Sequence, residues 1–392
     1  MMKVTTKRSH DSRLCVANII EEGKIGGPQV RIIQVAKFIE KNVKTVIIMP
    51  QENSNEFQQR CQSLGVPFQA IPLSRITKEL RPALRYLFFT PWEIIQLIRF
   101  FRQEKFNVIH VSGGIWQFKG AIAGRLAGIS VLWHLNDTDR PLLFRWIFGI
   151  LSCLATGYAY AAERTKIYYQ PYVHNKRLEF MIPAPVDTNW FDPNLDLPPD
   201  QLLSKLEGKF VIGTLANPSP VKDVKSFLKM AAKLQELTSL PLEFVIVGRV
   251  YEAQQNYFNS LEKISKQLRV SVQWAGPRVD VRSLLKRFDI YLCSSRSESS
   301  PISVWEAMSM ANPIVSTDVG DVSLYVHDEE NGFVVPVGDV DQLTNRVLRL
   351  LNDETMCRRF GNNSRKIAQQ NLDISFCGER HLNAYQQIYS CF

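Results

Sequence analysis

Two glutamates stand eight residues apart where the chain passes from a strand into a helix. Glu298 lies in the loop after an apolar run that ends at Ser294 and Ser295, and Glu306 lies in the first turns of the helix that follows. Each carboxylate can accept two hydrogen bonds, so the pair suits vicinal hydroxyl groups. The amides of the loop and of the helix start are natural donors to phosphate. The alternative is a helix with ordinary N-terminal acids, which its dipole favours.

The first half of the chain carries two further positions of this kind. Gly26 and Gly27 follow the first apolar run and precede the first long helix. Without a Cβ their amides can come close to a diphosphate, although a plain tight turn is the other interpretation. His134 closes the apolar run 131–134. A histidine at a strand end is either structural or part of a site.

The elements that position these residues alternate along the whole chain. Short apolar runs predict strands at 14–19, 45–49, 107–111, 131–134, 210–215, 243–247, 271–275, 290–293 and 314–316. Helical periodicity predicts helices at 29–40, 116–126, 224–237, 254–267, 281–287, 302–310 and 340–351. This alternation predicts an α/β fold with parallel sheets covered by helices on both faces.

The length of 392 residues predicts two domains. The stretch 187–208 contains three prolines and breaks the alternation, so it is interpreted as a linker followed by a short helix. It separates an N-terminal domain, 1–186, from a C-terminal domain, 209–372. Ligands of such sheets bind at the carboxyl ends of the strands, so two facing domains should hold their site in a cleft between them.

Charge is unevenly divided between the two halves. The net charge is +9, yet residues 1–186 hold 25 Lys and Arg against 13 Asp and Glu, whereas residues 187–392 hold 22 against 25. The basic half could face phosphates, a membrane surface or an acidic substrate, or it could be a solvated surface without a partner.

Cysteines and apolar segments bear on the compartment. The seven cysteines form no CxxC pair and no metal-binding spacing, which suits a reducing cytoplasm. The basic start of the chain is followed by a predicted strand rather than by a signal peptide. The apolar stretches 86–101 and 144–162 are interrupted by charged residues, proline or glycine, so neither is expected to cross a membrane. The second is interpreted as a helix that runs into a strand.

The stretch 289–338 resembles the donor-site signature of retaining glycosyltransferase family 4, whose members have the GT-B fold of two Rossmann-like domains facing across a cleft. Order and spacing hold over about fifty residues, and a fainter similarity covers nearly the whole chain. The matching residues are Ser294, Ser297, Glu298, Pro301, Glu306, Ala307, Met308, Pro313, Ser316, Thr317, Gly320, Asn331, Gly332, Phe333 and Pro336.

The resemblance implies a role for each matching residue. Glu298 would contact the hydroxyls of the transferred sugar, Glu306 the ribose, and His134 would orient the sugar. Lys222 and the loop at Gly26 and Gly27 would meet the donor diphosphate. Further donor-binding positions are Arg249, Arg278, Ser299, Ser300, Pro301 and Ile302. The segment 373–392 would form a last helix that packs back on the N-terminal domain.

This sequence also departs from the family pattern. Asn217 stands where the family usually has an arginine, about five residues before Lys222, and Arg249 is a candidate to supply the missing charge. Ser299 replaces a common glycine, and Leu324 stands where an acid is common.

The resulting prediction is a retaining, hexosyltransferase-type glycosyltransferase. It would move a sugar from a nucleotide-sugar to a saccharide or lipid-linked acceptor, in the synthesis of a cell-surface polysaccharide or glycolipid. The expected location is cytoplasmic and peripheral to the inner membrane face, with the basic half near anionic lipid and no nucleic acid as partner. No cofactor or metal is expected, since Asp137 and Asp139 are the only weak candidates for a metal-binding pair. The alternatives are a GT-B sugar-nucleotide epimerase and a non-catalytic nucleotide-sugar-binding protein.

Overall fold

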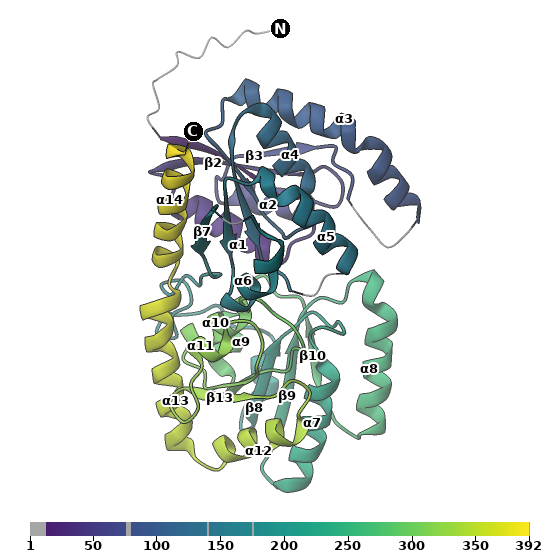
Figure 1. The fold of residues 1–392 in the computed structure, drawn as a ribbon. Coiled ribbons are helices and arrows are strands. Elements are labelled where there is room, and N and C mark those ends of the chain that lie inside the picture. Colours follow the sequence, from purple (N-terminus) through teal and green to yellow (C-terminus); the bar gives the residue numbers. More distant parts are fainter. Residues whose placement is uncertain (1–12, 76–79, 139–140, 175, 392) are drawn as a thin grey trace.

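A computed structural model describes residues 13–75, 80–138, 141–174 and 176–391, without the side chains of 80–85 and 87 (Figure 1). Two α/β domains lie one above the other, each built on one sheet. The N-terminal sheet has the strand order β3-β2-β1-β4-β5-β6-β7, and the C-terminal sheet has the order β10-β9-β8-β11-β12-β13. Neighbouring strands pair in parallel throughout both sheets.

The N-terminal domain contains the first seven strands and six α-helices of the described chain. Its strands are β1 (Leu14–Ile19), β2 (Val43–Pro50), β3 (Phe68–Ile71), β4 (Val108–Val111), β5 (Ser130–Leu135), β6 (Gly157–Tyr160) and β7 (Leu178–Met181). Its helices are α1 (Gly27–Phe38), α2 (Asn55–Ser63), α3 (Leu80–Glu104), α4 (Phe118–Ala127), α5 (Leu142–Leu151) and α6 (Glu163–Tyr169). Helices α3, α4 and α5 bury side chains in one apolar cluster, so they cover the same face of the sheet.

The C-terminal domain repeats this architecture. Its strands are β8 (Phe210–Leu215), β9 (Leu242–Val247), β10 (Gln273–Gly276), β11 (Ile290–Cys293), β12 (Ile314–Thr317) and β13 (Gly332–Val335). Its helices are α7 (Val224–Leu237), α8 (Gln255–Gln267), α9 (Arg282–Arg287), α10 (Ile302–Ser309), α11 (Val322–Tyr325), α12 (Val340–Leu351) and α13 (Glu354–Ile367). Every residue of β11 and β12 is buried, as expected for strands covered on both faces.

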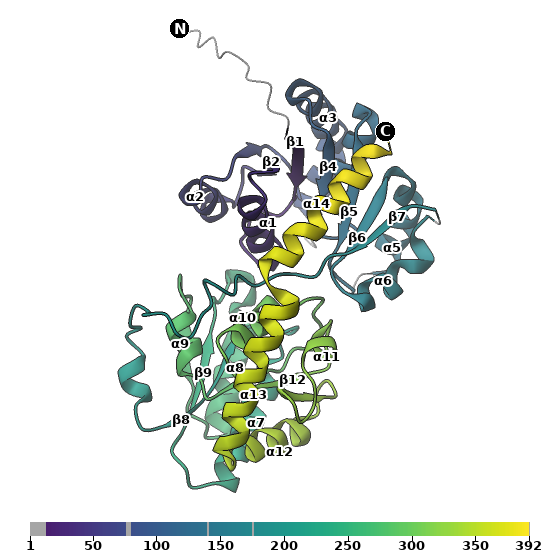
Figure 2. The ribbon, with the colours of Figure 1, turned by 90° about the vertical axis from the view of Figure 1, so that its left-hand side faces the viewer.

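The last helix, α14 (Ile374–Ser390), leaves the C-terminal domain and lies along the N-terminal one (Figure 2). The chain passes between the domains at two adjacent points, because Val186 and Asp373 form a parallel bridge. Buried residues of α14, among them Ile374 and Ile388, pack against side chains of β1 and α1. The N-terminal domain is therefore completed by residues far away in the sequence.

Each predicted strand and helix overlaps an observed one, so the predicted fold class is confirmed. The stretch 144–162 does contain a helix and a strand, α5 and β6. Strands β3, β7 and β13 and helices α2, α3, α6, α11 and α13 were not predicted. Strands β3 and β7 lie at the two edges of their sheet and are only partly buried, so their sequences carry no continuous apolar run.

Candidate functional site

A cleft of about 450 Å³ opens between the two domains. It is lined by residues that follow the carboxyl ends of β8, β9 and β11, by the first turns of α1 and α10, and by Asn136 after β5. Of the residues predicted from sequence, Gly26, Gly27, Lys222, Arg249, Arg278, Glu298, Ser299, Ser300, Pro301, Ile302 and Glu306 line it. The structure thus brings together all of the predicted site residues except His134.

Lys222 and Glu298 form the polar centre of the C-terminal wall. The Lys222 Nζ lies 2.6 Å from Glu298 Oε1, and the Ser295 hydroxyl donates to the same oxygen at 2.8 Å. Burial lowers the pKa of Lys222, but the ion pair and hydrogen bond with Glu298 outweigh it and hold the pKa above its ordinary value. Because both contacts use Oε1, the second oxygen of Glu298 is placed to accept from a ligand.

Glu306 lies on the first turns of α10, on the same wall. Burial disfavours its charged form and raises the pKa of Glu306 to about 8, although Arg60 nearby acts in the opposite direction. The helix begins after Pro301 without a side-chain cap, and its first residues, Ile302 and Ser303, line the cleft, so their amides are candidates to donate to a ligand. Hydroxyl groups of a ligand would give this carboxylate the hydrogen bonds that favour its charged form.

The loop between β11 and α10 is held by backbone and hydroxyl contacts. The Ser299 hydroxyl donates to Asn136 O of the other domain at 2.8 Å, and Ser300 Oγ accepts from the Ala184 amide at 3.0 Å. Gly320 has φ +53°, and a Cβ there would lie 2.0 Å from Ser299 O. Only glycine fits this contact, so Gly320 holds the backbone of the loop at Ser299. Through its hydrogen bond to Asn136 O, Ser299 links the two domains.

Two arginines of the cleft are already paired. Arg249 Nη1 lies 2.6 Å from Glu56 Oε2 on α2, and Arg278 Nε lies 2.5 Å from Asp200 Oδ2. The Arg249 amide donates to Asn217 Oδ1 at 2.7 Å. Arg249 thus lines the cleft with its guanidinium bonded to a carboxylate of the other domain, and the expectation that it replaces the absent arginine stays a prediction.

The glycine loop lies at the start of α1. Gly26 precedes the first helical residue, Gly27, and a Cβ on Gly27 would meet Ile302 Cδ1 of the other domain at 3.6 Å. Both glycines have extended or helical backbone, so their contribution is the absence of a side chain at the cleft. The backbone N–H groups of Gly26 and Gly27 therefore lie at the cleft, whereas Pro28 has no N–H to donate.

His134 was predicted to face the transferred sugar, but it has no exposed surface and does not line the cleft. Its Nε2 lies 2.6 Å from Nη1 of Arg31, which does line the cleft. The guanidinium of Arg31, carried on α1, stands between the imidazole and the opening. The sequence argument did not single out Arg31; its signal is one charged residue inside the apolar run of the helix 29–40.

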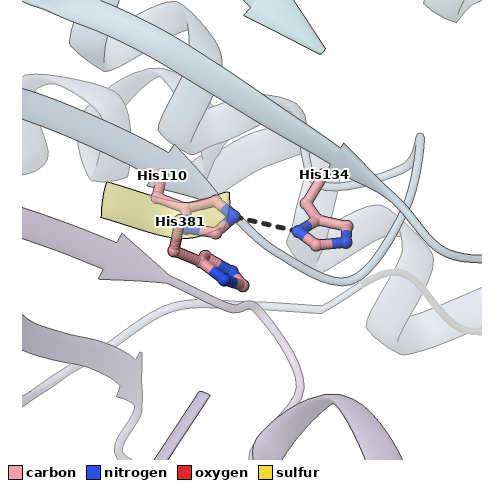
Figure 3. A group of neighbouring side chains, drawn as sticks. All are labelled: His110, His134 and His381. Carbon is pink, nitrogen blue, oxygen red and sulfur yellow. Dashed lines mark hydrogen bonds between the residues drawn. The ribbon is translucent and has the colours of Figure 1, made fainter. Parts of the chain in front are cut away.

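His110, His134 and His381 form a buried cluster (Figure 3). In the described part of the chain this is the one group of three such side chains whose possible metal-binding atoms all lie within 4.8 Å of one another. His110 Nε2 lies 3.2 Å from His134 Nδ1, and His110 Nδ1 lies 2.7 Å from the Tyr385 hydroxyl. Both rings therefore have partners at both nitrogens, and the adjacent Arg31 would repel a cation. Burial, with neighbouring positive charge, holds the pKa values of His110 and His134 well below their usual range, so both are neutral.

The other metal candidates were Asp137 and Asp139. Asp137 Oδ1 accepts a hydrogen bond from the Tyr169 hydroxyl at 2.6 Å. Asp139 lies outside the described residues.

Comparison with known proteins shows a family similarity in the C-terminal wall of the cleft. Residues 201–367 match the family model described as glycosyl transferases group 1. This match supports a relation of the C-terminal domain to that family. The matched segment contains Lys222, Glu298 and Glu306 of the C-terminal wall.

Curated relatives extend the similarity beyond this domain. One is the UDP-Gal:alpha-D-GlcNAc-diphosphoundecaprenol alpha-1,3-galactosyltransferase of Escherichia coli, 24% identical over 327 residues that cover 74% of this chain and 83% of that protein. Another is the putative glycosyltransferase EpsD of Bacillus subtilis, 25% identical over 252 residues that cover 63% of each chain. These glycosyltransferase relatives and the group 1 match support a transferase.

Solved structures give the fold. The Anabaena Alr3699/HepE complex with UDP and glucose matches with a TM-score of 0.79 and 18% identity, over 95% of this chain and 99% of that one. Sucrose-phosphate synthase of Thermosynechococcus elongatus matches with a TM-score of 0.80 and 15% identity, over 97% and 100%. The predicted GT-B fold is confirmed. Within the described residues, every helix is too short or too polar to span a bilayer.

Proposed function

We propose that this protein is a retaining glycosyltransferase that moves a sugar from a nucleotide-sugar to a saccharide or lipid-linked acceptor. The observation that carries the proposal is the C-terminal wall of the cleft, where Lys222, Glu298 and Glu306 lie within the segment that matches the group 1 family model. Carboxylates there can accept from hydroxyls, while a lysine and helix-start amides can donate to phosphate.

Each group of the wall then has one task. Glu306 accepts from the ribose hydroxyls and Glu298 from those of the transferred sugar. Lys222 and the first amides of α1 and α10 stabilise the negative charge that develops on the leaving diphosphate. This charge stabilisation needs no bound cation, so we also propose that transfer does not require a divalent metal.

The bond changes follow from these positions. The bond between the anomeric carbon and the diphosphate oxygen breaks, and the acceptor oxygen bonds to the same carbon. The acceptor proton passes to the leaving diphosphate. The carboxylates that line the cleft are Glu56, Glu298 and Glu306, of which Glu56 is paired with Arg249 and Glu298 with Lys222. No carboxylate is assigned as a nucleophile, so reaction on one face with retention is proposed.

The proposed acceptor is a lipid-linked saccharide at the inner membrane face. The relative from Escherichia coli is named for a diphosphoundecaprenol substrate, and the N-terminal half of this chain is strongly basic. Helices α3 and α5, on one face of this domain, expose the large apolar side chains Phe88, Trp92, Leu142 and Trp146. Apolar side chains together with basic charge suit an anionic bilayer surface.

Product analysis tests the activity. The protein is incubated with nucleotide-sugars and undecaprenyl-diphosphate-linked saccharides, and the products are separated and examined by NMR. A new glycoside with the donor's anomeric configuration supports the proposal. An epimerised donor would indicate an epimerase, and binding without turnover would indicate a nucleotide-sugar-binding protein.

The metal-free mechanism has its own test. Initial rates with the matched substrates should change little in excess EDTA, whereas Lys222→Ala should lower the rate by about a hundredfold or more, because it removes the charge beside the diphosphate. Complete loss in EDTA with recovery on Mn²⁺ addition would contradict this mechanism and direct attention to Asp137 and Asp139.

A further inference from the structure

The N-terminal wall of the cleft carries two buried hydrogen-bond donors that have no partner. Arg31 is 2% exposed and lines the cleft; its Nη1 donates to His134 Nε2, but its Nη2 is buried and makes no hydrogen bond. Asn136 also lines the cleft, and its Nδ2 is likewise buried without a partner. Buried donors without a partner are costly, so two of them among the residues that line one wall of the cleft indicate a ligand.

The charge on Arg31 is not neutralised by the protein. Its neighbours are the neutral rings of His134, His110 and His381, and among the described residues no carboxylate lies within ion-pair distance of it. Burial lowers the pKa of Arg31 to about 10, so the group is still charged at neutral pH. A buried cation is normally paired. By contrast, Lys222, Arg249 and Arg278 each have a carboxylate partner.

The chemistry of this wall selects the ligand. Arginine is a donor only and carries a positive charge, and the buried atom of Asn136 without a partner is a donor too, so both atoms can donate to an anion. The opposite wall, with Glu298 and Glu306, has the reverse character. Hydroxyls therefore suit the C-terminal wall, whereas an anionic acceptor group such as phosphate suits Arg31 and Asn136.

We propose that Arg31 and Asn136 form a phosphate subsite that binds oxygen atoms of the donor diphosphate from the N-terminal domain. Arg31 lies one turn along α1 from Gly27, whose end of the helix also faces the cleft. The subsite supplies a positive charge without a carboxylate partner among the described residues, whereas Arg249 is paired with Glu56. This inference rests on the proposed use of a nucleotide-sugar.

His134, His110 and Tyr385 act as positioning residues for Arg31. Because the guanidinium can only donate, His134 Nε2 must accept, which puts the proton of His134 on Nδ1. That proton points to His110 Nε2 at 3.2 Å, which assigns the proton of His110 to Nδ1. The Tyr385 hydroxyl, at 2.7 Å, is nearer to this Nδ1 than Asn18 Nδ2, at 3.3 Å, and is the group that accepts from it. Each group donates to the next, from Arg31 at the cleft through His134 and His110 to Tyr385 on α14.

The first experiment measures UDP affinity by isothermal titration calorimetry, with uridine as the ligand that lacks phosphate. Arg31→Met should raise the Kd for UDP about ten- to a hundredfold, the range for loss of a charged hydrogen bond, with a smaller loss in Arg31→Lys. The Kd for uridine should stay within about twofold. Unchanged UDP affinity, or an equal loss for uridine, would overturn the subsite.

Asn136 separates phosphate from hydroxyl as the ligand. Asn136→Ala removes one neutral donor, whereas Asn136→Asp places a carboxylate against the proposed phosphate. We expect Asn136→Asp to weaken UDP binding at least about tenfold more than Asn136→Ala. If Asn136→Asp binds UDP as well as the alanine variant does, the group facing this wall is not a phosphate and the proposal is wrong.

The positioning role is tested by replacing His134. Gln can accept from Arg31 and Phe cannot, so His134→Gln should keep most of the UDP affinity and His134→Phe should lose about as much as Arg31→Met. His381→Phe is the matched control, since its ring is equally buried but bonds Cys377 O. Equal losses in all three histidine variants would indicate packing alone and overturn this role.

The two proposals fail in different ways. If the wild type binds none of UDP, ADP and GDP, the proposed use of a nucleotide-sugar donor is wrong, and so is the phosphate subsite that rests on it. If the wild type binds UDP while Arg31→Met, checked for folding by its thermal transition, binds equally well, only the subsite is wrong.

Discussion

Glu306 lies on the cleft wall in surroundings that favour its protonated form until a ligand arrives. Burial raises its pKa to about 8, and only the carboxylate can accept from two hydroxyls. Binding below pH 8 must therefore release a proton. The Kd for the nucleoside diphosphate should fall about tenfold between pH 7 and pH 9, and this dependence should vanish in Glu306→Gln. A wild-type affinity that is flat across this range would contradict the assignment.

The same carboxyl affects stability without ligand. Its pKa rises on folding from about 4.5 to about 8, so between these values the folded chain keeps a proton that the unfolded chain has lost. The free energy of unfolding should therefore fall as pH rises through this window. Glu306→Gln should be more stable than the wild type at pH 8.5 and similar to it at pH 4.5, which thermal unfolding at the two pH values measures.

Residues of the site differ in how far sequence could reveal them. Glu298 and Lys222 lie in loops and Glu306 on the first turns of α10, at a spacing that is visible along the chain, and all three line the cleft. Arg31 and Asn136 stand out only because each has a buried nitrogen without a hydrogen-bond partner. Whether a side chain has such a partner depends on the three-dimensional structure and cannot be seen in the sequence. His134 was expected to face the sugar because of the family resemblance, yet its ring is buried and hydrogen-bonded to Arg31 of another element.

At the scale of elements, α5 offers the clearest test of membrane contact. Leu142 is 69% exposed and Trp146 is 66% exposed. Replacing both by Ser should reduce partitioning onto phosphatidylglycerol vesicles at least about tenfold, since each buried apolar side chain contributes about 1.5–3 kcal/mol. Leu237→Ser on α7 of the other domain, at 55% exposure, is the matched control and should partition as the wild type does. If the wild type, the double variant and Leu237→Ser co-sediment equally with vesicles, α5 does not contact the membrane.

The turn before α11 holds the loop that carries Glu298. Gly320→Ala combines a left-handed backbone with a Cβ 2.0 Å from Ser299 O, so the loop must move. Gly338 also has positive φ, +80°, but open space around it. Gly338→Ala should cost about 1–2 kcal/mol of unfolding free energy, and Gly320→Ala more than that, with a larger loss of nucleotide affinity. Equal thermal shifts in the two variants would show that the loop adapts.

Element prediction succeeded where burial is uniform and failed where it is mixed. The buried strands β8 and β11 coincide with their predicted ranges because both faces are covered and every residue is apolar or small. Helix α3 was not predicted from the sequence. It contains Pro91, and its exposed aromatic side chains obscure the pattern expected of an amphipathic or a buried helix. Its exposed face has no partner within the described chain that would explain the pattern.

At the scale of the whole molecule, α14 determines whether the N-terminal domain is complete. Its side chains Cys377, Ala384, Tyr385 and Ile388 are buried against that domain. A chain ending at residue 373 should lose soluble yield and the hydrogen-exchange protection of β4 and β5. A chain ending at residue 390 should behave as the wild type. Retained protection in the shorter chain would show that the N-terminal sheet is stable without the helix.

The return of α14 also sets an order of events during synthesis. The C-terminal domain is continuous in sequence from β8 to α13, so it can fold as soon as those residues have left the ribosome. The N-terminal sheet emerges earlier but must wait for residues 374–390 to cover its apolar face. Domains usually fold in the order in which they are synthesised, but here the N-terminal domain completes its packing after the C-terminal domain can fold. For most of translation, this chain exposes an apolar surface that chaperones can bind.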